Sequence, residues 1–417
     1  MVAMSFYTTL LKNGFWIIPI AGVLLFLIPH EYNNNSEDEI CFSFISQWYD
    51  TVAGTFRNLQ LNFYRKDKSV ELYDNQAKKI FLKRFHLQGI EERDFYIGNT
   101  IVILSRHLKI IDYANDFTKQ EVNKRRQRTF AMVKPDAVSK VGEIVTFIQD
   151  SGFEITQMKM VKLDQEQAKI FYEEHLGRSF YRDLVEYIAS GPVVAMELVG
   201  NDSIANWRKL LGPTDSEVAR LEVPDSLRAK FGTNNQKNAA HGSDSTFSAL
   251  RELEFFFPSE DNKKQQNIRL VTPKESDLTT CCLIKPHVVR SGKLGNILIS
   301  IIKNGFHLSA LKMIRLEKSQ AEEFLEIYKG VVPEYQKMVQ QLISGPLVAL
   351  AISGIGDLVH ENFRKFVGPQ DPDVAKELRP HSLRALFGED KVRNGIHCTD
   401  LLEDTHLEVD FFFKILQ

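Results

Sequence analysis

The stretch Asn238-Ala-Ala-His-Gly-Ser-Asp-Ser245 determines the fold and the chemistry expected of this chain. An apolar pair, a histidine and then Gly-Ser-Asp predict a short strand that ends at His241, followed by a helix capped by Ser243 or Asp244. A neutral imidazole is a good nucleophile near neutral pH when an acceptor holds its other nitrogen. Glu252, eleven residues after His241, is the expected acceptor. A single histidine of this kind is more often a structural residue, so the functional interpretation depends on its neighbours.

The same order of residues returns near the C-terminus as Asn394-Gly-Ile-His-Cys-Thr-Asp400, again with a glutamate eleven residues after the histidine. The two histidines are 156 residues apart, as are Arg228 and Arg384, whereas Lys134 and Lys285 are 151 residues apart. A constant offset over the later part of the repeat indicates a duplicated domain that gained a few residues upstream. Two copies, each large enough for a core of its own, fit this pattern better than a solenoid does.

The bulk composition is that of a globular protein. A length of 417 residues predicts two to four domains, and 43% of the residues are hydrophobic and 25% charged. The formal net charge of −2 excludes a global attraction to nucleic acid or acidic membranes. The four cysteines, of which Cys281 and Cys282 are adjacent, contain no Cys-x-x-Cys pair. A reducing compartment is therefore expected.

The first 39 residues differ in character from the rest. Residues 15–28 form an uncharged run of 14 residues that Pro19 interrupts. This is shorter than the roughly 20 residues that a membrane-spanning helix needs. No small-x-small cleavage site follows the run. We therefore expect residues 1–39 to be a peripheral extension or a gene-model artefact, neither a cleaved signal nor a membrane span, and we expect no stable membrane partner.

Residues 40–123 have the pattern of a small, aromatic-rich β domain. Residues 59–64 and 69–74 alternate with period two around a charged turn, which predicts a hairpin. Further strands are expected at 79–85, 100–104 and 108–113. The region contains no paired acid and base, no glycine-rich phosphate loop and no metal-ligand spacing. It is expected to bind rather than catalyse. The basic run at 124–128 is expected to be a solvated linker at a domain boundary, and the alternatives are a nuclear signal or a contact with an anionic surface.

This β domain resembles the DM-ten domain. The resemblance rests on Phe44-Ile-Ser-Gln-Trp-Tyr-Asp, Asp94-Phe-Tyr-Ile-Gly-Asn and Leu108-Lys-Ile-Ile-Asp-Tyr, in that order. It covers nearly the whole of residues 40–123. DM-ten domains are found in proteins of ciliary doublet microtubules, so the resemblance implies attachment to microtubules.

From residue 129 the pattern is strand, helix, strand, at 129–133, 141–150 and 153–163. A helix at 165–175, a strand at 193–198, a helix at 202–211 and a strand that ends at His241 follow. This order is a ferredoxin-like plan with an inserted helical stretch, and it restarts at 279. The expected fold class is therefore α/β (α+β), with two ferredoxin-like domains at 129–257 and 279–417, a linker at 258–278 and the β-rich domain in front.

The other candidates for chemistry in the first copy are cationic or hydrogen-bonding residues. They are Lys134, Arg208, Thr214, Arg228 and Asn238. Such groups around one histidine would neutralise a polyphosphate and the charge on a phosphoryl group in transfer. No Gly-x-x-x-x-Gly-Lys-Ser/Thr motif is present, so the chain has no P-loop.

Both copies resemble nucleoside diphosphate kinase domains, because residues 238–244 match the signature Asn-x-x-His-Gly-Ser-Asp. The resemblance implies that His241 is a nucleophile that forms a phosphohistidine, with Glu252, Ser243 and Lys134 in catalytic roles. The nucleotide contacts that it implies are made by Lys134, Tyr172, Phe180, Arg208, Thr214, Arg228 and Asn238, with Phe180 stacking on the base. It also implies that Mg²⁺ arrives with the nucleotide and that the protein has no dedicated metal site.

The second copy matches this set in part. The resemblance implies His397 as nucleophile and a nucleotide-binding set of Lys285, Arg364, Arg384 and Asn394, and Tyr328 and Glu408 are also retained. Gln370 replaces the threonine, and Cys398-Thr399 replaces Gly-Ser. Phe180 has no clean counterpart, and Tyr335 is the nearest residue to one. Cys398 is expected to bring a side chain close to the ligand. We therefore expect the second copy to bind nucleotide weakly or to be structural.

The order of a DM-ten domain and two such kinase domains resembles the architecture of one branch of the family. Proteins of this branch lie inside ciliary doublet microtubules. This implies a microtubule inner protein of the axoneme of cilia and flagella, in the cytoplasm and cytoskeleton, with tubulin and other axonemal inner proteins as partners. The branch is also linked to γ-tubulin complexes at centrosomes. The alternative is an enzyme, either a ping-pong kinase that exchanges phosphate between nucleoside tri- and diphosphates, or an autokinase or 3′-5′ exonuclease of the same family.

Overall fold

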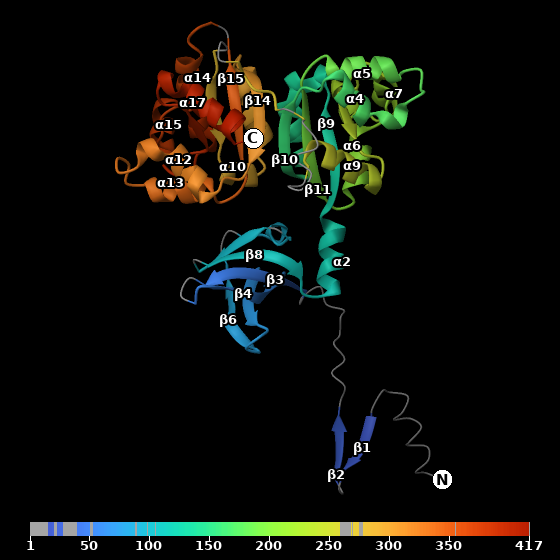
Figure 1. Cartoon of the computed structure of the whole chain (residues 1–417), viewed down its shortest axis with the longest axis vertical. Coiled ribbons are helices and arrows are strands. Elements are labelled where there is room, and N and C mark those ends of the chain that lie inside the picture. The colour runs from blue at the N-terminus through green and yellow to red at the C-terminus, as the bar shows by residue number, and fades with distance from the viewer. Residues whose placement is uncertain are drawn as a thin grey trace. The chain divides into compact units, whose positions relative to one another are not determined.

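The computed structural model describes residues 40–50, 53–87, 90–97, 99–104, 106–258, 268, 270–274, 278–354 and 356–416, and the backbone of β1 (Trp16–Ile20) and β2 (Val23–Leu27). β1 and β2 pair antiparallel (Figure 1). The rest of residues 1–39, on which the expectations for the N-terminal segment depend, lies outside the described residues. No helix in the described ranges is long and apolar enough to cross a membrane. The chain divides into two compact units, residues 1–122 and 123–417.

The first unit contains a six-stranded antiparallel sheet in the order β6-β5-β4-β3-β8-β7. The strands are β3 (Cys41–Asp50), β4 (Thr55–Tyr64), β5 (Ser69–Asp74), β6 (Lys79–His86), β7 (Thr100–Ile103) and β8 (Arg106–Tyr113). The predicted hairpin and the three further strands are confirmed. Phe44 and Phe63 both stack on Phe95, with ring centroids 5.8 and 4.2 Å away, and these rings fill the core of the unit.

The basic run at 124–128 is not the solvated linker that the sequence predicted. Helix α2 (Asp116–Arg125) includes its first two residues, and β9 (Gln127–Val133) begins two residues later. Arg126 donates to Glu154 over 2.9 Å, and Arg128 donates to Glu197. The run therefore lies in regular structure, and two of its cations are already paired with carboxylates.

The second unit is built on one eight-stranded sheet in the order β12-β9-β11-β10-β14-β15-β13-β16. The first copy supplies β9, β10 (Glu154–Val161), β11 (Val193–Gly200) and β12 (Ala240–Gly242). The second copy supplies β13 (Thr280–Ile284), β14 (His307–Ile314), β15 (Leu347–Ser353) and β16 (Ile396–Cys398). In each half the last strand pairs with the first, and the third lies between the first and the second. This is the ferredoxin-like order, and the predicted fold class is confirmed.

The helices repeat in the same way. The first copy contains α3 (Val141–Asp150), α4 (Gln165–Phe171), α5 (Tyr181–Ala189), α6 (Ser203–Leu211), α7 (Ser216–Glu222), α8 (Leu227–Phe231) and α9 (Thr246–Phe256). The second contains α10 (Pro286–Arg290), α11 (Leu294–Lys303), α12 (Lys318–Phe324), α13 (Tyr335–Leu342), α14 (Val359–Val367), α15 (Pro372–Leu378), α16 (Leu383–Phe387) and α17 (Thr405–Asp410). Helices α4 and α5, and likewise α12 and α13, form the inserted stretch between the second and third strands. α6 and α14 pack on the sheet as the second helix of the ferredoxin-like plan.

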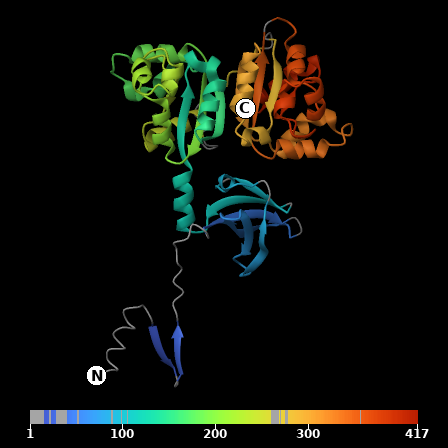
Figure 2. The same cartoon turned by 180° about the vertical axis from the view of Figure 1, so that it is seen from behind.

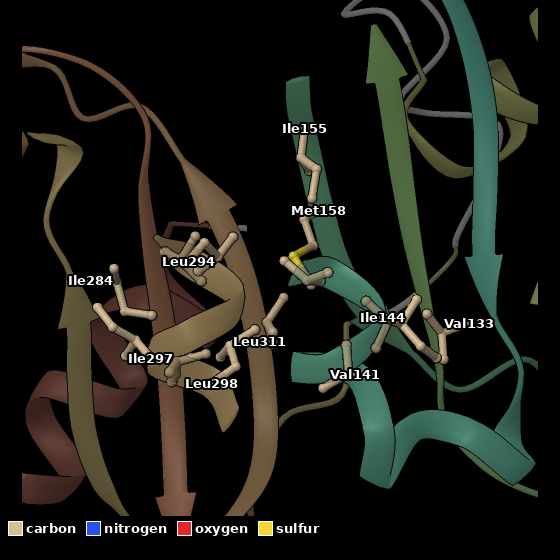
Figure 3. Packing of buried hydrophobic residues seen from close by; sticks show 14 of the residues in the cluster. Val133, Val141, Ile144, Ile155, Met158, Ile284, Leu294, Ile297, Leu298 and Leu311 are labelled. Atoms are coloured by element: carbon tan, nitrogen blue, oxygen red, sulfur yellow. The ribbon is translucent and has the colours of Figure 1, made fainter. Parts of the chain in front are cut away.

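The two copies share a core, contrary to the expectation that each copy would close around its own. The edge strands β10 and β14 pair at Lys159 and Lys312, and α3 packs on α11. Figure 2 shows the first copy, in teal to green, beside the second copy, in orange to red. The helices approach so closely that a Cβ on Gly142 would lie 2.6 Å from the backbone nitrogen of Ile299. Figure 3 shows Met158 of the first copy and Leu311 of the second copy facing each other where the two copies meet. Each copy also has an apolar cluster of its own, on the other face of its half of the sheet.

Candidate active site

His241 lies in β12 at the edge of the sheet, and its ring is held by a buried carboxylate. Its Nε2 is 3.0 Å from Oε1 of Glu252, and Ser243 donates to Oε2 of the same carboxylate over 2.6 Å. Burial raises the pKa of Glu252, but the imidazole charge and the bonds from His241 and Ser243 outweigh it and lower this pKa overall. Because Glu252 is an ionised acceptor, the Nε2 atom carries the proton. The Nδ1 atom then keeps the lone pair that a nucleophile needs.

Ser243 has a different role from the helix cap that the sequence predicted. The backbone N–H of Phe130 donates to its Oγ over 3.3 Å, which orients the hydroxyl toward Glu252. The cap of α9 is Ser245, whose Oγ accepts from the N–H of Ser248 over 3.1 Å. Sequence reasoning placed the cap one or two residues too early, because Ser243, Asp244 and Ser245 are all good capping residues.

A strained residue precedes the histidine. Ala239 has φ +68°, in the left-handed region that side chains with a Cβ rarely adopt. Its N–H donates to Oδ2 of Asp136 over 3.1 Å, and its carbonyl accepts from the N–H of Lys134 over 2.8 Å. Tyr187 donates to the other oxygen of Asp136. Asp136 and Tyr187 therefore hold the backbone that presents His241, and sequence reasoning missed them because they lie 51 residues apart on different elements.

Lys134 and Asn238 form a buried polar pair next to this turn. The Lys134 ammonium donates to Oδ1 of Asn238 over 2.7 Å and to the carbonyl of Gln236 over 3.4 Å. Burial, and secondly the charge on Arg228, lower the pKa of Lys134 to about 7. The Asn238 amide donates to the carbonyl of Thr214 over 2.9 Å. An anion beside Lys134 would relieve the cost of its buried charge.

Two buried donors near His241 lack a partner within the described residues. The Tyr172 side chain is 2% exposed, its hydroxyl is unpartnered, and its ring meets the His241 ring edge-on at 5.9 Å. The Nε of Arg228 is also unpartnered, while its two other nitrogens donate to the carbonyls of Gly212 and Ala240. A buried donor without an acceptor is costly. These donors fit a phosphate group as their acceptor.

The remaining predicted residues of the first copy lie at the rim. Arg208 is exposed on α6, and its guanidinium makes no hydrogen bond or ion pair with the described residues. Thr214 is exposed, and its carbonyl accepts from Asn238. Phe180 is 51% exposed and meets the ring of His175, which stacks on Tyr172. Hydrogen bonds thus connect Lys134, Thr214 and Arg228 to the segment 238–240 that precedes His241, and the exposed ring of Phe180 reaches Tyr172 through His175.

The described residues include no group of three His, Cys, Asp or Glu side chains that could hold a metal ion. The donors around His241 fit phosphate oxygens rather than a cation.

Comparison with known proteins decides the family. The pattern described as nucleoside diphosphate kinase matches residues 127–262 and 279–416. The chain belongs to the nucleoside diphosphate kinase family. Nucleoside diphosphate kinase homolog 7 of Rattus norvegicus is 46% identical over 375 residues, which cover 90% of this chain and 93% of the rat protein. The homolog 7 of Mus musculus is equally similar. Probable nucleoside diphosphate kinase 5 of Arabidopsis thaliana is 50% identical over 128 residues, which cover 30% of this chain and 89% of the plant protein.

The second kinase domain repeats the histidine geometry. Nε2 of His397 lies 2.9 Å from Oε2 of Glu408, and Thr399 donates to the same oxygen over 2.9 Å. The N–H of Cys281 donates to the Thr399 hydroxyl over 3.2 Å, as that of Phe130 does to Ser243. Thr399 therefore replaces Ser243 with the same partners in sequence, although it shares one carboxylate oxygen with His397 whereas Ser243 and His241 bind different oxygens of Glu252.

The expectation that Cys398 would bring its side chain close to the ligand is wrong. Cys398 is 3% exposed and belongs to the apolar core that the two domains share. Burial raises the pKa of its thiol. Tyr335 is likewise no counterpart of Phe180, because it is 6% exposed and its hydroxyl donates to the carbonyl of Glu322. Tyr181 makes the corresponding bond to the carbonyl of Lys169 in the first domain, so Tyr335 corresponds to Tyr181.

The cationic set of the second domain is bound to its own backbone and side chains. Lys285 donates to the carbonyl of Val392 over 2.9 Å, and burial lowers its pKa to about 7. Arg384 donates to the carbonyls of Ile396 and Gly368. Asn394 donates to the backbone carbonyl of Gln370 over 3.1 Å, so the side chain at position 370 is not needed for this bond. Arg364 donates to Asp400 over 2.5 Å.

Proposed function

We propose that the first kinase domain accepts the γ-phosphoryl group of a nucleoside triphosphate on Nδ1 of His241. The observation that carries this proposal is the hydrogen bond from Nε2 to the buried Glu252, because it leaves Nδ1 unprotonated and stabilises the cation formed on attack. The bond from the terminal phosphorus to the bridging oxygen breaks as the bond to Nδ1 forms. The nucleoside diphosphate leaves, and a second diphosphate reverses the step.

The residues around His241 have separate parts in this reaction. Tyr172 and the buried Lys134 would donate to the oxygens of the transferred group, and Arg228 and Arg208 would bind the bridging oxygens and the other phosphates. Phe180 would stack on the base at the rim. Ser243 and Arg251, whose guanidinium lies 3.7 Å from Oε1, hold Glu252 ionised. Mg²⁺ would arrive with the nucleotide and offset the charge of its phosphates.

Labelling of the purified full-length protein tests this function. Incubation with magnesium ATP labelled in the γ-phosphate should produce one acid-labile phosphohistidine, which peptide mapping assigns to His241. The His241→Ala variant should lose this label, and His397→Ala should keep it. Label that survives in His241→Ala and vanishes in His397→Ala would reverse the assignment. The rate of phosphate exchange between nucleotides on the same samples separates a working kinase from an autokinase, and release of nucleotides from a 3′-labelled DNA strand tests the exonuclease alternative.

We further propose that the protein is a microtubule inner protein of ciliary and flagellar doublet microtubules, with tubulin and other axonemal inner proteins as partners. A second location at centrosomal γ-tubulin complexes is part of this proposal. It is supported by the resemblance of residues 40–123 to DM-ten domains and by a β unit in which sequence and structure offer no catalytic set among the described residues. Immunogold labelling of axoneme cross-sections tests it, since a luminal protein is labelled only after the doublets are opened.

A further inference from the structure

The second kinase domain contains a carboxylate between two of its expected phosphate contacts. Tyr328 donates its hydroxyl hydrogen to Oδ2 of Asp400, and Arg364 donates to Oδ1 over 2.5 Å. The same nitrogen of Arg364 also donates to the backbone carbonyls of Asp400 and Thr399 over 2.7 and 3.2 Å. Asp400 thus engages the Tyr328 hydroxyl and one terminal nitrogen of the Arg364 guanidinium, and it places a negative charge where a phosphate would bind.

The corresponding carboxylate of the first domain is held elsewhere. Asp244 accepts a hydrogen bond from the Ser248 hydroxyl over 2.6 Å, and the hydroxyls of Ser248 and Ser245 are 2.9 Å apart. Arg208 is near enough to lower the pKa of Asp244, after the larger effect of the bond from Ser248, but the two form no ion pair. Tyr172 keeps an unpartnered hydroxyl. The two phosphate contacts of the first domain are therefore open.

The difference follows from the residues after each aspartate. At the constant offset of 156 residues, Ser245 corresponds to Leu401 and Ser248 to Asp404. Leu401 cannot cap a helix, and α17 begins only at Thr405 after a short 3-10 turn, whereas α9 begins at Thr246. Asp404 offers a negative charge where Ser248 offers a donor. Asp400 therefore finds no partner on its own helix and turns to Arg364 and Tyr328.

We propose that Asp400 is an internal anion that closes the second nucleotide site, and that Ser248 is the positioning residue that prevents Asp244 from closing the first. This inference rests on the proposed function, because that function assigns phosphate binding to these arginines and tyrosines. A nucleoside diphosphate or triphosphate must displace Asp400 to bind the second domain. Its apparent affinity is reduced by the fraction of molecules in which the carboxylate is bound.

The closure is reversible on physical grounds. The side chains of Arg364 and Asp400 are 41% and 42% exposed, so water screens their attraction and can replace either partner. A phosphate carries more charge and more acceptor oxygens than one carboxylate, and it binds an arginine fork with two parallel bonds. The second domain is thus a low-affinity site that fills only when nucleotide is abundant, while the first fills at lower concentration.

Calorimetric titration of magnesium ADP into the full-length protein tests this proposal. The wild type should show one stronger and one weaker site, and Asp400→Asn, which keeps the shape and removes the charge, should tighten the weaker site by about 10-fold or more. Glu403→Gln is the matched control, since it removes an exposed carboxylate three residues from Asp400 that forms no hydrogen bond or ion pair with the described residues, and it should leave the weaker site unchanged. A weaker site that Asp400→Asn does not tighten, or two equal sites in the wild type, would overturn the closure.

The first domain provides an independent test, in which a second substitution should reverse the loss of affinity caused by the first. Ser248→Ala should release Asp244 and weaken the stronger site by about 10-fold, and adding Asp244→Asn should restore it. A loss of helix structure alone would not be rescued by removing a charge, so a double variant as weak as Ser248→Ala would contradict the proposal.

The melting temperature of each variant shows whether it folds, and Asp400→Ser replaces Asp400→Asn if the latter does not. If the first site binds no magnesium ADP, the proposed function fails, while the tightening by Asp400→Asn still decides the closure.

Discussion

Gly242 lies directly against Trp207, and a Cβ built on this glycine would lie 2.3 Å from the indole nitrogen. The indole N–H donates to the carbonyl of His241 over 3.3 Å, so the contact also holds the strand of the nucleophile. In the second domain Cys398 and Phe363 occupy the corresponding positions, and both are buried in the shared core. The glycine after the histidine is therefore paired with the tryptophan, and the two positions have changed together between the copies.

This pairing predicts a coupled effect on stability. Gly242→Cys alone should destabilise the fold by about 2 kcal/mol or more, because the thiol has no space beside the indole. Trp207→Phe alone should also destabilise it, through a cavity and a lost hydrogen bond. The double variant should be more stable than the sum of the two single effects predicts, by at least about 1 kcal/mol. Chemical denaturation of the four proteins measures this coupling, and strictly additive effects would show that the two positions are independent.

The left-handed residue before each histidine gives a second prediction. Gly395 has φ +84°, and Ala239 has φ +68° in the corresponding place. Gly395→Ala should cost about 1–2 kcal/mol, because the new Cβ is strained and lies 3.3 Å from the backbone of Phe387. The matched variant Ala239→Gly should change the free energy of unfolding by less than about 1 kcal/mol, since relief of strain is offset by the loss of a buried methyl group. Equal and opposite changes in the two variants would contradict this account.

The buried lysines predict how stability depends on pH. Burial lowers the pKa of Lys134 and of Lys285 to about 7, whereas an unfolded lysine titrates at 10.5. Between about pH 7 and pH 10 the unfolded chain binds more protons than the folded one, so each lysine makes stability rise with pH in this window. The rise should be about 1–3 kcal/mol per lysine and should disappear in the matching methionine variant. Denaturation midpoints at pH 7 and pH 9.5 check this, and parallel shifts in the wild type and the Lys134→Met/Lys285→Met double variant would contradict it.

Much of the fold was predictable because each element has a local signature. Helix α3 was predicted with its observed bounds, since residues 141, 144, 145 and 148 form one buried face. The His241 to Glu252 contact followed from a spacing of eleven residues within one strand, turn and helix. These features depend on residues that are near one another in sequence.

The features that were missed depend on residues that are far apart. An edge strand such as β10 has the same alternation whether water or β14 lies beside it, so the shared sheet of the two domains was not visible in the pattern. The pairing of Arg126 and Arg128 with glutamates on other strands turned an expected linker into regular structure. Asp400 is the residue that the family signature has at this position. Its partners nevertheless differ from those of Asp244, because the side chains of Leu401 and Asp404 offer it no hydrogen-bond donor.

The last prediction concerns attachment to the doublet microtubule. Residues 1–122 and 123–417 are separate compact units, and the apolar core of the β unit is distinct from those of the kinase domains. The basic run at 124–128 is less suited to bind tubulin, because Arg126 and Arg128 already form ion pairs with glutamates of this chain. If the β unit makes the lattice contact through a folded surface, binding should persist in about 0.5 M salt, where exposed charge pairs are screened over a few ångströms.

Deletion of residues 1–122 should therefore strip the protein from salt-washed axonemes, while the remaining kinase unit keeps its phosphohistidine label. A variant that keeps the β unit and replaces Arg126 and Arg128 by glutamine is the matched control and should stay bound. Western blots of washed axonemes from cells that express each form measure the bound fraction. A deletion variant that remains as tightly bound as the full chain would place the lattice contact on the kinase domains and leave the β unit with another partner.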